Sequence, residues 1–134
     1  MRTAYVESSA LVKLATNEAE SEELRATLVL DDLLVTSHLT AVEVVRAGAR
    51  ADGDAGRALA RAALTRFSTI PVDHGVLDAA ARLVPDSLRS LDAIHVATAL
   101  AVDDGDLIFY SYDRRTLEAA RANGLRTASP GASI

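Results

Sequence analysis

Short apolar runs alternate with longer amphipathic stretches along this chain. Runs of this length, rich in β-branched and aromatic residues and bounded by turn residues, are typical of buried strands. We place strands at residues 4–6, 33–36, 69–72, 107–110 and 125–127. Apolar residues three or four apart predict helices between them. These helices fall at residues 10–14, 17–30, 41–51, 55–67, 75–84, 91–102 and 113–122.

The alternation of strands and helices predicts the fold class. It is typical of an α/β domain with a parallel sheet that helices cover on both faces. The stretch 91–102 is apolar on nearly all sides, which indicates a buried helix. With 134 residues and no internal repeat or linker, residues 1–134 are expected to form a single domain.

Composition narrows the class of protein. The chain has no cysteine, which excludes disulfides, thiolate nucleophiles and cysteine-bound zinc, and suits a reducing cytoplasm. No apolar run reaches the roughly 18 residues that a membrane span needs, so we expect a cytoplasmic protein without membrane association. The net charge of −5 argues against binding nucleic acid over the whole surface, but it allows a local basic face.

Four acidic residues stand at junctions between strands and helices. Glu7 follows the first strand, and Glu43 lies one turn into the helix after the second. Asp92 opens the apolar helix, and Asp113 follows the strand at 107–110. Because the carboxyl ends of parallel strands share one edge, Glu7, Asp113 and the start of the Glu43 helix are expected there. Asp92 joins them if its helix begins at the same edge.

Four carboxylates at one edge would repel each other. Two like charges about 4 Å apart cost roughly 4 kcal/mol at an effective dielectric constant near 20. Either some of these groups are protonated or a cation neutralises them. Oxygen ligands without cysteine or clustered histidine favour Mg²⁺ or Mn²⁺ over Zn²⁺. Such an ion activates water for attack on a phosphodiester.

Each acid also has a purely structural interpretation. Thr40 and Glu43 have the spacing of a capping box. Asp113 is a typical N-cap residue, and Glu7 suits the positive end of a helix. Asp92 has apolar neighbours and is expected to be half-buried, so it needs a partner.

The hydroxyl and imidazole groups leave further alternatives open. Ser8 and Ser9 either cap the first helix, or Ser8 reaches a metal-bound water or a phosphate. No Gly-x-Ser-x-Gly motif is present, which argues against a serine hydrolase. His38, His74 and His95 lack the spacing of metal ligands, and His95 is expected to be a hydrogen-bonded core residue.

Arginines stand close to three of the acids, and basic groups there would hold phosphates near a metal. The alternative is ordinary helix surface. The candidates are Arg46 and Arg50, one and two turns after Glu43, then Arg114 and Arg115, directly after Asp113, and Arg89, shortly before Asp92.

Four segments of the chain resemble the successive motifs of a known family. They read YVESSALVKL, TAVEVVRA, SLDAIHVATAL and FYSYDRRTLEAA. In this order they are similar to PIN-domain ribonucleases, and most of all to the VapC toxins of bacterial toxin–antitoxin pairs. The resemblance covers nearly the whole chain, and the third and fourth segments are the most specific.

The resemblance implies a three-layer α/β/α sandwich and a metal-dependent endoribonuclease, the toxin of a type II toxin–antitoxin system. It implies Mg²⁺ or Mn²⁺ as cofactor and a structured RNA, tRNA or rRNA, as substrate. It also implies a homodimer that a VapB-like antitoxin holds in a heterotetramer or larger assembly. The metal-binding and catalytic acids would be Glu7, Glu43, Asp92 and Asp113, with Ser8 as a hydroxyl beside the first acid.

One position departs from the family pattern. The family usually has aspartate where this chain has Glu7, and glutamate adds one methylene group. This motivates an alternative function, a catalytically weakened PIN-like domain that mainly binds its antitoxin or RNA. A phospho-acceptor receiver domain ranks below both, because that class needs a lysine after its last strands and Lys13 is the only lysine here.

Overall fold

The computed structural model describes residues 2–31 and 33–134. The strands in these ranges are β1 (Thr3–Val6), β2 (Leu33–Ser37), β3 (Ser68–Ile70), β4 (Ile108–Tyr110) and β5 (Arg126–Ala128). The helices are α1 (Ser8–Ala15), α2 (Ser21–Leu28), α3 (His38–Leu64), α4 (His74–Ala81), α5 (Ser90–Val102) and α6 (Arg114–Ala122).

The strands form one sheet in the order β3-β2-β1-β4-β5, and every neighbouring pair is parallel. The predicted parallel sheet is therefore confirmed. β1 occupies the centre, where Tyr5 pairs with Val35 on one side and Phe109 on the other. All four residues of β1 are buried, as expected for a strand covered on both faces.

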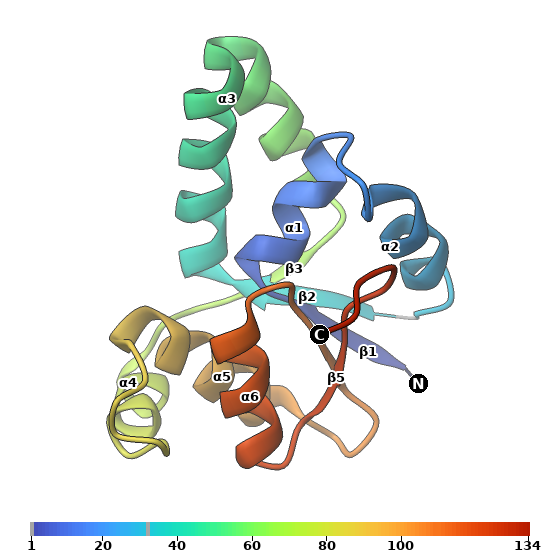
Figure 1. The fold of residues 1–134 in the computed structure, drawn as a ribbon. Helices are drawn as coiled ribbons and strands as arrows, with labels where there is room; N and C mark the ends of the chain where they lie inside the picture. Colours follow the sequence, from blue (N-terminus) through green and yellow to red (C-terminus); the bar gives the residue numbers. More distant parts are fainter. Residues whose placement is uncertain (1, 32) are drawn as a thin grey trace.

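Helices cover both faces of the sheet, which gives the expected α/β/α sandwich (Figure 1). Ala4 and Val6 point into a core formed with α1, α2 and α3. Tyr5 points the other way, into a core formed with α5 and α6, as the two-residue period of a strand requires. Six residues of α5 are fully buried, and this helix also packs against α4, so the prediction of a buried helix is confirmed.

The gap between the helices predicted at residues 41–51 and 55–67 appears as a turn that interrupts α3. The backbone leaves the helical region at Asp52 and Gly53, and Gly53 has a positive φ of 53°. The two halves of α3 then fold back on each other (Figure 1), and the backbones of Gly48 and Gly56 touch. A Cβ atom at either glycine would overlap the carbonyl oxygen of the other.

One predicted helix is shorter than expected. The stretch 17–30 forms a helix only from Ser21 to Leu28. Asn17 does not cap it, because the Asn17 side chain accepts a hydrogen bond from Arg25 instead. Within the described ranges, no helix combines the length and the apolar character needed to cross a membrane.

Candidate active site

The structure brings the four acids to one edge of the sheet, where β1, β2 and β4 end. Glu7 is the N-cap of α1, and Asp113 is the N-cap of α6. Glu43 lies in the second turn of α3 and Asp92 in the first turn of α5. The condition set for Asp92 is met, because α5 starts at this edge and the charge of Asp113 acts on Asp92.

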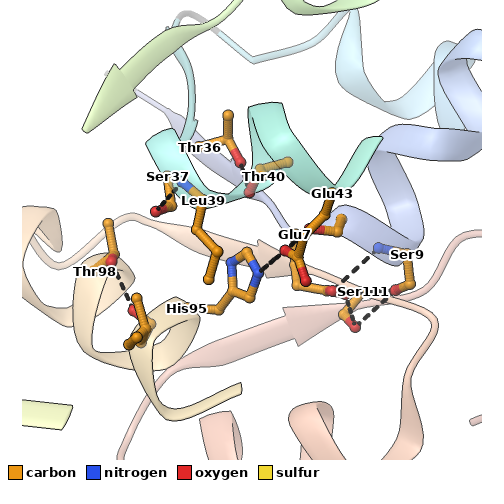
Figure 2. A network of polar contacts seen from close by, with 12 residues as sticks. Glu7, Ser9, Thr36, Ser37, Leu39, Thr40, Glu43, His95, Thr98 and Ser111 are labelled. Atoms are coloured by element: carbon orange, nitrogen blue, oxygen red, sulfur yellow. Dashed lines mark hydrogen bonds and ion pairs between the residues drawn. The ribbon is translucent and has the colours of Figure 1, made fainter. Parts of the chain in front are cut away.

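Glu7 is buried, with 5% of its surface exposed, and its carboxylate is occupied by hydrogen bonds. Oε1 accepts from the hydroxyls of Ser9 at 2.5 Å and Ser111 at 2.6 Å, and Oε2 accepts from the backbone N–H of Ser9 at 3.1 Å. The Ser9 hydroxyl in turn accepts a hydrogen bond from the backbone N–H of Tyr112, and the Ser111 hydroxyl accepts one from that of Asp113. Figure 2 shows how Glu7 thereby joins α1 to the loop after β4.

The prediction that Ser8 or Ser9 caps α1 is wrong. The N-cap is Glu7, whose side chain accepts the N–H of Ser9. A carboxylate is a stronger acceptor than a hydroxyl at the positive end of a helix, and the structural alternative for Glu7 is thus correct.

Glu43 takes no part in a capping box, so that alternative is also wrong. The N-cap of α3 is Ser37, and the hydroxyl of Thr40 pairs with a threonine of β2. Oε1 of Glu43 instead accepts hydrogen bonds from Ser8 Oγ at 2.5 Å and from His95 Nε2 at 2.8 Å. Glu43 is half-buried, with 31% of its side chain exposed.

Burial alone would raise the pKa of Glu43. The hydrogen bonds from His95 and Ser8, together with the charge interaction with His95, outweigh burial and lower this pKa. Glu43 is therefore a carboxylate at neutral pH.

Asp92 behaves in the opposite way. Burial raises its pKa, and the negative charge of Asp113 raises it further. Thr116, His95 and Arg89 act against these effects without cancelling them. Asp92 is half-buried as expected, and a cation bound nearby would offset the repulsion from its like-charge neighbour.

Asp113 caps α6 through one oxygen, which accepts from the N–H groups of Arg115 at 3.0 Å and Thr116 at 3.2 Å. The structural interpretation of Asp113 is correct, but it leaves Oδ2 without a hydrogen bond from a described residue.

His95 is a hydrogen-bonded core residue, as predicted, with 1% of its surface exposed. Sequence reasoning missed that it also contacts one of the acids, Glu43. Its Nδ1 lies 2.8 Å from the hydroxyl of Tyr5, and its Nε2 faces Glu43. Ser8 Oγ lies 3.3 Å from the same Nε2, so the geometry differs from a Ser-His-acid triad, in which serine and acid face opposite ring nitrogens.

The candidate arginines lie in two places and are all exposed. Arg89 and Arg115 line a cavity of about 310 Å³ together with Asp92. Arg46 and Arg50 line a second cavity, of about 280 Å³, between the halves of α3. That cavity also includes Arg57, which the sequence did not single out and which pairs with Asp54. Arg114 lies at the start of α6.

The atoms available as metal ligands at this edge of the sheet suit a hard divalent cation. Oε2 of Glu43 and Oδ2 of Asp113 accept no hydrogen bond from a described residue, and all available donors are oxygens. In this side-chain arrangement, residues 2–31 and 33–134 contain no group of three acids or histidines placed to hold a metal ion. The metal-binding role of Glu7, Glu43, Asp92 and Asp113 stays a prediction.

Comparison with known proteins identifies the family. The sequence matches the PIN domain over residues 4–122. The chain belongs to the PIN-domain family, and its curated relatives are VapC proteins. Ribonuclease VapC46 of Mycobacterium tuberculosis is 43% identical over 132 residues, which cover 97% of this chain and 99% of that protein. Ribonuclease VapC47 of the same species is 38% identical and covers 96% and 97%.

Solved structures agree with the fold. The DNA-bound VapBC of Salmonella typhimurium has a TM-score of 0.76 at 14% identity, covering 96% of this chain and 98% of that one. VapC20 of M. tuberculosis, described as a toxin that cleaves the sarcin-ricin loop, has a TM-score of 0.71 at 18% identity, covering 95% and 99%.

Proposed function

We propose that this protein is an endoribonuclease that depends on Mg²⁺ or Mn²⁺ and acts as the toxin of a type II toxin–antitoxin system. The observation that carries the proposal is the position of Asp92 beside Asp113 and within reach of the Glu43 network, at one edge of the sheet. Identity of 43% to a ribonuclease over nearly the whole chain supports the same activity.

In this proposal Glu43, Asp92 and Asp113 supply the oxygens that hold the ion. Asp92 and Asp113 reach it by rotation of their side chains, since both stand in or before the first turn of a helix at this edge. A bound divalent ion would lower the pKa of a water molecule that it binds, and it would neutralise charge on the phosphate. Glu7 holds the loop after β4 in place, and Ser8 helps to fix Glu43.

The arginines bind the RNA backbone in this proposal. Arg89 and Arg115 share a cavity with Asp92, and both are exposed. They are therefore available for phosphates next to the scissile one. Arg46, Arg50 and Arg114 would contact phosphates farther along the RNA.

The partners follow from the solved relatives. VapBC complexes from several bacteria share this fold, so we propose a VapB-like antitoxin and a homodimer of this chain within a heterotetramer or larger assembly in the cytoplasm. VapC20 is described as cleaving the sarcin-ricin loop, which places rRNA beside tRNA as the first substrates to test.

The experiment is cleavage of a panel of purified tRNA, rRNA and a sarcin-ricin-loop oligonucleotide by the purified protein. Cleavage is expected with Mg²⁺ or Mn²⁺ and not with EDTA. Asp92→Asn should lose at least about 100-fold in rate, because it removes a charge that the ion needs. Asp103→Asn, at the opposite end of α5, is the matched control and should cleave like the wild type. Absence of cleavage with either metal across the panel would refute the proposal.

A second candidate function rests on Glu7. Its carboxylate is already occupied by Ser9 and Ser111, which favours a weakened enzyme that mainly binds its antitoxin or RNA. Glu7→Asp separates the two functions. If this substitution creates or strongly increases cleavage, the natural protein is the weakened form; if it lowers cleavage, glutamate is the working residue here.

A further inference from the structure

A chain of hydrogen bonds runs from the central strand to Glu43. Tyr5 of β1 bonds through its hydroxyl to Nδ1 of His95 at 2.8 Å, and Nε2 of His95 bonds to Oε1 of Glu43 at 2.8 Å. The three residues come from β1, α5 and α3. Tyr5 and His95 are 0% and 1% exposed, so only the Glu43 end of this chain reaches solvent. Figure 2 shows the imidazole of His95 directed at Glu43.

The positions of the protons follow from hydrogen-bond chemistry. A glutamate side chain is ordinarily a carboxylate at neutral pH and only accepts hydrogen bonds, so Nε2 of His95, 2.8 Å from Oε1 of Glu43, carries a hydrogen and donates it. In a neutral imidazole Nδ1 is then the acceptor, and the Tyr5 hydroxyl donates to it. Because a tyrosine hydroxyl ordinarily ionises only near pH 10, the phenol of Tyr5 keeps its proton at neutral pH. One tautomer thus satisfies all three groups.

The core holds this chain rigidly. The ring of Tyr5 stacks on Phe109 with centroids 5.2 Å apart and planes 5° from parallel. It meets His95 edge to face, at 6.1 Å and 73°. Both rings are buried in the core, where close packing restricts alternative side-chain conformations. Oε1 of Glu43 is therefore held by two donors, Ser8 and His95, whereas Oε2 has no hydrogen bond from a described residue.

We propose that Tyr5 and His95 are positioning residues that hold Glu43 ready as a ligand for the divalent ion, before Asp92 and Asp113 turn toward it. The inference rests on the proposed function, because it assigns these residues to the same metal site. Residues that orient a metal ligand typically change metal affinity 10- to 100-fold when they are replaced.

The main test is Tyr5→Phe, which removes one oxygen from the chain. Direct titration of the purified protein with Mn²⁺ by calorimetry should show about 10-fold weaker binding. Tyr110→Phe is the matched control, because Tyr110 is equally buried but its hydroxyl bonds to Asp31, away from this network. The control should lose comparable thermal stability and bind Mn²⁺ like the wild type.

Histidine variants and NMR give independent readouts. His95→Gln keeps an N–H donor and should retain more Mn²⁺ affinity than His95→Leu, which has none. Imidazole ¹⁵N spectra of the metal-free wild type should show His95 as the Nε2–H tautomer, with Nδ1 shifting in Tyr5→Phe. An Nδ1–H tautomer in the wild type would overturn the positioning role.

The two proposals fail in different ways. Wild-type protein that binds Mn²⁺ but cleaves no RNA would overturn the ribonuclease and leave the positioning role intact. Cleavage by the wild type together with unchanged Mn²⁺ affinity in Tyr5→Phe and His95→Leu would overturn the positioning role alone.

Discussion

At the scale of single residues, two of the candidate acids also stabilise the fold. Glu7 and Asp113 each cap a helix, and Glu7 additionally joins α1 to the loop after β4. The Glu7 carboxylate accepts three hydrogen bonds, including the N–H that it caps, and all three donors belong to Ser9 and Ser111.

Ser111→Ala tests this interpretation. The change removes one of the two hydroxyl donors from a buried carboxylate, so it should destabilise the protein by about 1–3 kcal/mol. Urea unfolding followed by circular dichroism measures the difference. Ser87→Ala, at an exposed serine, should stay within about 0.5 kcal/mol of the wild type. Equal effects of the two substitutions would show that Glu7 does not depend on Ser111.

The three tyrosines predict how stability depends on alkaline pH. Burial raises the pKa of Tyr110 and of Tyr112 to about 12, and it raises that of Tyr5 further. In the unfolded chain tyrosine ionises near pH 10. Between these values only the unfolded chain loses protons, so stability is complete below about pH 10 and falls as the pH rises toward 12.

An absorbance titration of phenolate formation checks this. The folded protein should show no transition near pH 10, whereas the protein in urea should show all three tyrosines ionising there. A full tyrosine transition near pH 10 in the folded protein would contradict the prediction.

The sequence predicts where three of the four acids lie but not what each one bonds to. Glu7, Asp113 and the start of the Glu43 helix could be placed because the ends of parallel strands follow from the hydrophobic pattern. Asp92 could not be placed, because the sequence does not show at which edge of the sheet its helix begins. The bonds to Ser111 and His95 could not, since their partners are 104 and 52 residues away and depend on the register of the sheet and the rotation of α5.

At the scale of elements, α3 depends on a close contact between its two halves. Because Gly48 and Gly56 touch through their backbones, a side chain at either position would push the halves apart. Gly56→Ala should therefore destabilise the protein by about 1–3 kcal/mol, although alanine is the better helix former. Thermal unfolding is the measurement.

Gly75→Ala in α4 is the control for this substitution. A Cβ atom there would lie 3.5 Å from Asp73 Oδ1, an ordinary contact, so the change should be neutral or stabilise by up to about 1 kcal/mol. Stabilisation by both alanines would mean that the halves of α3 separate at no cost.

The break in α3 could be predicted because Asp-Gly-Asp is a local turn signal. The start of α2 could not, because Asn17 has a suitable side chain for a cap but is engaged by Arg25 from a later turn. Local sequence signals therefore predict most helices and strands, whereas the residues at which they begin and end also depend on contacts between elements.

At the scale of the whole molecule, the same acids that are proposed to bind the metal lower the stability of the metal-free protein when they repel each other. The raised pKa of Asp92 means that its ionised form weakens the fold: the favourable contribution is present below the unfolded pKa and is lost as the pH rises through the folded pKa. At pH 7 the metal-free Asp92→Asn protein should thus melt at a higher temperature than the wild type.

With metal bound, the wild type should instead melt at a higher temperature than Asp92→Asn. Saturating Mn²⁺ should raise the melting temperature of the wild type, since a ligand at 100 times its Kd adds about 2.7 kcal/mol. Asp92→Asn should gain little. Thermal scans in EDTA and in Mn²⁺ measure both effects, and equal gains by the two proteins would remove Asp92 from the metal site.

The central place of β1 has a consequence for synthesis. β1 is translated first, yet one of its two neighbours in the sheet is β4, which begins at Ile108. At 5–20 residues per second, a ribosome needs roughly 5–20 s to travel between them. A nascent polypeptide therefore cannot bring the four acids to one edge of the sheet until translation is nearly finished.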